Sequence, residues 1–154
     1  MKNIIFAMAM VCLAAGAAYA QKISIDKVPA IVQASFKKQF TSVTKPQWEM
    51  ESADYEVTFQ NKGVESSAKY DKQGAWLETE EEIKEAELPA VVKQEVEKQF
   101  PGFKMNEVEK ASYPGNKIAY EMEMSKGKEA YNVQFSSEGK LLKKEVQNKK
   151  EKKD

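Results

Sequence analysis

The chain has 154 residues, in which 24 basic residues balance 24 acidic ones, and histidine is absent. All 24 basic residues are lysine, and the only cysteine is Cys12. Apart from Cys12, this composition excludes catalytic triads, cysteine nucleophiles, metal sites built on histidine or cysteine, and arginine clamps for phosphate. The balanced charge argues against a nucleic-acid partner.

Residues 1–20 have the features of a cleaved signal peptide. A basic Lys2 precedes an apolar stretch over residues 4–18, and Ala18-Tyr19-Ala20 matches the A-x-A pattern of signal-peptidase sites. The apolar stretch is too short for a spanning helix. We therefore expect cleavage after Ala20, which also removes Cys12, and a periplasmic or secreted protein with no stable membrane insertion.

The remaining chain repeats at a period of about 60–65 residues. The sequence VPAIV at residues 28–32 returns as LPAVV at 88–92, and KQF at 38–40 returns at 98–100. We expect a single domain over residues 21–147, made of two units at 24–83 and 84–147 that share one continuous core. A lysine-rich flexible tail follows at 148–154.

Each unit is predicted to open with a helix, because apolar residues recur at helical spacing behind a proline. These residues are Val28, Ile31, Val32, Phe36 and Phe40 in the first unit, and Leu88, Val91, Val92, Val96 and Phe100 in the second.

Strands with alternating polar and apolar residues follow each helix, separated by short turns, which predicts an antiparallel meander. Turn lengths predict that Asn61 opposes Val64 and that Tyr70 opposes Ala75, which places the apolar residues of three strands on one face. The same count places Trp76, and its repeat equivalent Leu141, on the other face. The segment near residues 107–112 has no clear alternation, so its faces are not assigned.

These segments resemble the PepSY-like family of exported bacterial proteins, also called β-lactamase-inhibitor-like. The resemblance rests on the signal, on the two helix starts at 28–30 and 88–90, and on residues 70–83 (YDKQGAWLETEEEI). It implies an α+β fold, in which two tandem helix-plus-four-strand units form one extended antiparallel sheet with the helices on one face. It also implies an inhibitor-like role, because PepSY modules are proposed to inhibit proteases, and it brings no catalytic residues.

The candidate partner-binding residues are those predicted to lie on the sheet face without helices. Trp is the residue type most frequent at binding hot spots. The other interpretation is structural, with the ring covered by the tail or by the linker between the units. The predicted set is Trp76, Leu141, Glu49, Glu56, Lys69 and Glu121.

Six acidic residues fall within positions 78–87. Such a run can attract a hard cation such as Ca²⁺, but the EF-hand pattern is missing. A solvated linker or a charged edge strand is the other interpretation. We predict no catalytic residues, no cofactor and no metal site.

The sequence therefore predicts a non-enzymatic binding module of the cell envelope. Its partner is expected to be an envelope or secreted protein, for example a hydrolase, bound through the open sheet face. The alternative is a small-molecule carrier or sensor that holds a ligand between sheet and helices. A third possibility is an enzyme that uses a carboxylate pair.

Overall fold

The computed structural model describes residues 21–51 and 53–147. The predicted signal peptide with its cleavage site, and the predicted tail at 148–154, lie outside the described residues.

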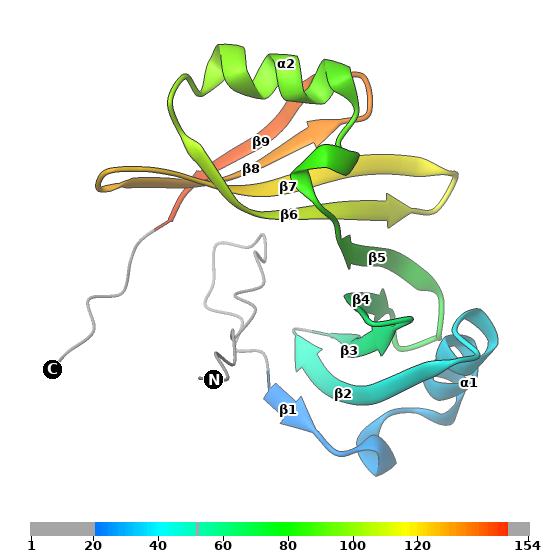
Figure 1. Cartoon of the computed structure of the whole chain (residues 1–154). Helices are drawn as coiled ribbons and strands as arrows, with labels where there is room; N and C mark the ends of the chain where they lie inside the picture. Colours follow the sequence, from blue (N-terminus) through cyan, green and yellow to red (C-terminus); the bar gives the residue numbers. More distant parts are fainter. Residues whose placement is uncertain (1–20, 52, 148–154) are drawn as a thin grey trace, which may run out of the picture.

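The described residues form an α+β fold with nine antiparallel strands and two helices (Figure 1). The helices are α1 (Ala30–Gln39) and α2 (Ala90–Gln99). The strands lie in one sheet in chain order: β1 (Gln21–Ile23), β2 (Val43–Glu51), β3 (Asp54–Asn61), β4 (Val64–Tyr70), β5 (Trp76–Glu82), β6 (Lys104–Tyr113), β7 (Lys117–Lys126), β8 (Glu129–Ser136) and β9 (Leu141–Val146). The predicted meander is confirmed, and β1 is an additional strand that pairs with β2.

The two helices start and pack in the same way. Pro29 and Pro89 occupy the N-cap positions, where a missing N–H breaks no helical hydrogen bond. Val32 and Phe36 of α1, and the corresponding valines of α2, are buried. Ile31 and Val91, which the helical spacing groups with these residues, are 56% and 41% exposed, so they lie outside the buried part of each helix.

The buried apolar residues form two clusters rather than the one continuous core that we expected. The first joins α1 to β2–β5, with Phe36 in edge-to-face contact with Trp48 and Phe59 at 5.4 and 5.1 Å between ring centroids. The second joins α2 to β6–β9 around Met122 and Phe135. A continuous sheet therefore connects two separate apolar cores.

The join between the two clusters is polar. Strand β5 pairs with β6 through four residue pairs, which are Thr79–Ser112, Glu80–Ala111, Glu81–Lys110 and Glu82–Glu109. The acidic residues 78–82 therefore lie in a strand that is paired on both sides. The interpretation of this part as a solvated linker or an edge strand was wrong.

A β-bulge follows the turn between β4 and β5. Tyr70 opposes Trp76, whereas Lys69 opposes Glu78, so Leu77 is the extra residue. The predicted pairing of Tyr70 with Ala75 was therefore wrong, and so was the placement of Trp76 on the open face, because Trp76 packs against the first cluster. An equivalent bulge at Leu142 brings Leu141 opposite Phe135 and into the second cluster.

Candidate functional site

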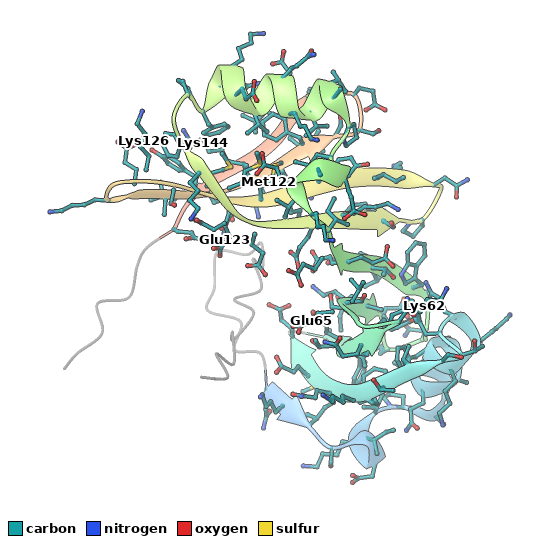
Figure 2. All side chains as sticks on the ribbon, viewed as in Figure 1. Lys62, Glu65, Met122, Glu123, Lys126 and Lys144 are labelled. Atoms are coloured by element: carbon teal, nitrogen blue, oxygen red, sulfur yellow. The ribbon has the colours of Figure 1, made fainter. Side chains whose placement is uncertain are left out.

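The candidate site is the face of the sheet opposite the two apolar clusters, which we call the open face. Paired residues share a face of a sheet, so the strand register identifies its members. They include Glu49, Glu56, Ser67, Lys69, Glu78, Glu80, Glu82, Glu107, Glu109, Tyr113, Glu121, Glu123, Gln134 and Lys143. Figure 2 shows the alternation on β7, where Met122 lies on the side of α2 and Glu123 lies on the other side.

Carboxylates stand directly opposite one another on this face. Glu82, Glu109 and Glu121 are register partners across β5, β6 and β7. The row continues with Gln134 on β8 and ends with Lys143 on β9. Like charges in directly opposed positions destabilise a sheet, so this row carries unfavourable electrostatic energy when its members ionise.

Several of these carboxylates are also buried. Glu80 is only 8% exposed and lies beside the small side chains of Ala111 and Ala119, which occupy the next two strands in its row. Burial, together with repulsion from the neighbouring carboxylates of Glu109 and Glu121, raises the pKa of Glu80 to about 9. Glu80 therefore holds its proton at neutral pH.

Two further carboxyl groups on this face have a pKa that burial raises. Burial raises the pKa of Glu109 to about 8, with Glu107 and Glu121 adding repulsion. Burial also raises the pKa of Glu56 to about 7, although Lys69 and Ser67 act in the opposite direction. The environment of the open face therefore disfavours the ionised form of Glu56, Glu80 and Glu109.

Part of the charge is neutralised within the face. Lys69 Nζ lies 3.4 Å from Glu51 Oε2, and it also lowers the pKa of Glu78, which burial raises. The hydroxyl of Ser67 lies within hydrogen-bond distance of Glu80 Oε2, at 3.3 Å. At the far edge Lys143 Nζ lies 2.9 Å from Glu145 Oε2. The row of Glu82, Glu109 and Glu121, on the strands between those of Lys69 and Lys143, remains acidic.

Polar side chains order the central carboxylates. Gln134 Nε2 donates hydrogen bonds to Glu121 Oε1 at 2.6 Å and to the Tyr113 hydroxyl at 2.9 Å, and that hydroxyl donates to Glu121 Oε1 at 3.3 Å. One row further, Gln147 Nε2 donates to Glu123 Oε1 at 2.6 Å. These bonds fix the carboxylates in place instead of leaving them free in solvent.

The sequence-predicted site residues divide into two groups. Glu49, Glu56 and Lys69 are consecutive register partners on the open face, and Glu121 lies on the same face in the second half of the sheet. Trp76 and Leu141 are not brought to this face.

Sequence reasoning missed Glu80, Glu109, Tyr113 and Gln134. Glu80 was part of an acidic run that was interpreted as linker or edge, and Glu109 and Tyr113 lie in or beside the segment whose faces were not assigned. The usable signal was the alternation of Glu78, Glu80 and Glu82 at period two, which is typical of a strand with one charged face.

Within residues 21–51 and 53–147, no group of three or more Asp, Glu, His or Cys side chains is arranged to hold a metal ion. In the same residues, no helix is long and apolar enough to cross a membrane.

Comparison with known sequences gives one family. The sequence model of the β-lactamase-inhibitor-like, PepSY-like family matches residues 17–67 and 53–143. No curated protein matches the chain significantly.

Solved structures share the fold. A crystal structure described as a "putative periplasmic" protein of Bacteroides eggerthii has a TM-score of 0.73 at 19% identity, over 77% of this chain and 88% of that one. A DUF2874 family protein of Bacteroides uniformis has a TM-score of 0.72 at 20% identity, with the same coverage. A BLIP-like protein of Bacteroides fragilis has a TM-score of 0.67 at 23% identity, over 77% and 85%.

Proposed function

The chain belongs to the PepSY-like, β-lactamase-inhibitor-like family, and from this premise we propose that it is an exported, non-enzymatic module that binds a protein through its open face. The partner presents lysine or arginine side chains to the acidic rows. Its place is the periplasm or the cell exterior, in agreement with the signal-like residues 1–20 and with the "putative periplasmic" description of a structural neighbour.

The observation that carries the proposal is the excess of buried carboxyl groups on the sheet face opposite the two apolar clusters. Glu56, Glu80 and Glu109 all have a raised pKa because burial and repulsion oppose their ionisation. A cationic side chain placed over them favours the ionised form and removes the repulsion. Charge complementarity of this kind gives a binding surface specificity and a fast association rate.

The arrangement supports binding more than catalysis. General acid–base chemistry needs carboxyl groups whose pKa values are pushed apart, so that one is protonated while the other is ionised. On the open face the three large shifts have the same direction and the same cause. An inhibitor-like action is then steric, with the rigid sheet covering the cleft of an envelope hydrolase.

We also propose that residues 21–147 are one domain of two tandem units, at 24–83 and 84–147. The proposal is supported by two helices of ten residues each, preceded by prolines, and by bulges at Leu77 and Leu142, which occupy equivalent positions of the repeat.

The alternative of a small-molecule carrier needs a cavity between helices and sheet. The packing in this region argues against it, because Phe36, Phe40 and Phe59 are in mutual ring contact at 4.6–5.5 Å. Aromatic contacts at this spacing are those of a filled core.

Crosslinked affinity capture from the native envelope tests the proposal with two variants of equal charge change. Glu121→Lys reverses a charge at the centre of the open face, whereas Glu97→Lys reverses an exposed charge on α2. We expect a protein partner to be captured by the wild type and by Glu97→Lys, to be lost with Glu121→Lys, and to be released by salt. Equal capture by all three chains, or a tightly bound small molecule in mass spectra of the native protein, would contradict the proposal.

A further inference from the structure

Strand β9 forms one edge of the sheet, and its outer side is unpaired. Among the described residues, β9 pairs with β8 alone. The N–H of Gln147 donates to the carbonyl of Ala130 on β8, at 2.8 Å. Backbone groups alternate along a strand, so Lys144 and Val146 direct theirs away from β8. An unpaired edge of this kind is a template for another strand.

The side chains of β9 include large apolar groups in contact with solvent. Leu142 is 50% exposed and Val146 is 68% exposed. Between them, Lys143 and Glu145 form an ion pair on the open face. A strand that carries this pattern is complementary to itself when it is reversed.

We propose that β9 pairs antiparallel with β9 of a second copy of this chain, about a two-fold axis at Lys144. This register places Leu142 opposite the partner's Val146, and Lys143 opposite the partner's Glu145. Both apolar residues become covered, and the two ion pairs become a closed ring of four charges. Opposed residues of unlike charge stabilise an antiparallel pair.

The two-fold axis places Lys144 opposite the partner's Lys144, and the local structure weakens the repulsion between these two charges. Lys144 Nζ lies 3.9 Å from the ring centroid of Tyr131 and 5.1 Å from that of Phe100, so its charge is directed back onto its own subunit. Figure 2 shows Lys144 on the side of the sheet that carries α2. Cation–π contacts of this kind hold an ammonium group over a ring face.

The charges of β9 favour this register over the two registers in which the axis is shifted by one residue. Moving the axis by one residue keeps the backbone pairing in phase but places Lys143 opposite the partner's Lys143, or Glu145 opposite the partner's Glu145. Both alternatives bring like charges together. The pairing at Lys144 is therefore the one that the β9 sequence favours.

This inference goes beyond the proposed function and does not depend on it, since the edge is separate from the centre of the open face. The dimer would set two open faces side by side on one continuous sheet. A partner with two basic patches would then be bound at both.

Sedimentation equilibrium of the mature protein tests the dimer across protein concentrations of about 1 µM to about 1 mM, the range in which a small interface associates. Lys143→Glu and Glu145→Lys each bring like charges together across the axis, and we expect each to weaken self-association about tenfold. Mixing the two single variants restores opposite charges at every pair, so the mixture should dimerise as the wild type does.

A third variant tests the backbone pairing. Lys144→Pro removes an N–H that points away from β8, and such a position tolerates proline. We expect a folded monomer. A wild type that stays monomeric at about 1 mM, or single-charge variants that self-associate like the wild type, would overturn the proposal. A mixture of the two that fails to dimerise would overturn it as well.

Discussion

Tyr70 stands opposite Trp76 across β4 and β5, while the preceding residue, Lys69, stands opposite Glu78. The bulge between these two pairs turns the indole of Trp76 toward the helix side. There its Nε1 donates a hydrogen bond to Thr79 Oγ1 at 2.9 Å. Trp76 is therefore a packing residue of the first cluster.

Replacing Trp76 with alanine should lower the free energy of unfolding by about 3 kcal/mol, because the cluster loses a large ring that nothing refills. Urea denaturation measures this effect. The same variant should keep its binding at the open face. A lost partner with an unchanged urea midpoint would instead return Trp76 to the binding surface.

Stability should fall as the pH rises across the neutral range. The pKa values of Glu56, Glu109 and Glu80 are raised from 4.5 to about 7, 8 and 9 in the folded protein. Between the ordinary pKa of 4.5 and these raised values, the native state binds more protons than the unfolded state. The free energy of unfolding therefore decreases with increasing pH. We expect it to be lower at pH 9 than at pH 5 by at least about 1.4 kcal/mol, the equivalent of one pKa unit.

The matched variant for this pH dependence is Glu80→Gln, which keeps the shape of the side chain and cannot ionise. Its stability should vary less between these pH values than that of the wild type and should exceed it at the alkaline end. Identical pH profiles for the two proteins would show that Glu80 is not the main proton-holding group.

Phe100 and Phe40 are equivalent in the repeat but differ in burial. Phe100 is 4% exposed in the second cluster, whereas Phe40 is only partly buried against the first. The structure predicts about 3–5 kcal/mol for Phe100→Ala and a smaller loss for Phe40→Ala. Thermal unfolding of both variants gives the comparison, and a larger loss for Phe40→Ala would contradict the assigned packing.

Gly139 closes the turn before β9 and lies against α2. Its φ is +83°, and an added Cβ would come within 3.1 Å of the carbonyl oxygen of Val91. Gly127 also has a positive φ, of 60°, but its Cβ would meet open space. Both alanine variants incur the left-handed backbone cost of about 1–2 kcal/mol. Gly139→Ala should cost clearly more by urea denaturation, and equal costs would mean that the turn can move away from the helix.

Much of the fold could be predicted from local sequence. Alternation and turn length gave the meander, and the pairing of Asn61 with Val64 is confirmed. Counting strand positions from the turn gave the wrong face for Trp76, because a bulge adds one residue to β5. Trp76 and Leu77 are both apolar, so either could face the core. In β6 the failure had another cause, since Lys110 lies on the helix side opposite Tyr120, which breaks the alternation.

The acidic site was less predictable than the fold. Glu80 acquires its raised pKa from burial and from Glu109 and Glu121, which are 29 and 41 positions further along the chain. Only the strand register brings these groups together. A single sequence shows the carboxylates but not which of them share a row.

The polar join between β5 and β6 has a consequence for how the molecule forms. The residues of the first apolar cluster lie between Ile23 and Trp76, and those of the second lie between Ile83 and Leu141, so the two sets do not interleave along the chain. Each strand from β2 onward also pairs with the strand synthesised just before it. Such short-range contacts close quickly. A chain that emerges N-terminus first, from a ribosome or an export channel, can therefore complete the first cluster before the second exists, and then offers β5 as the template on which β6 is laid down.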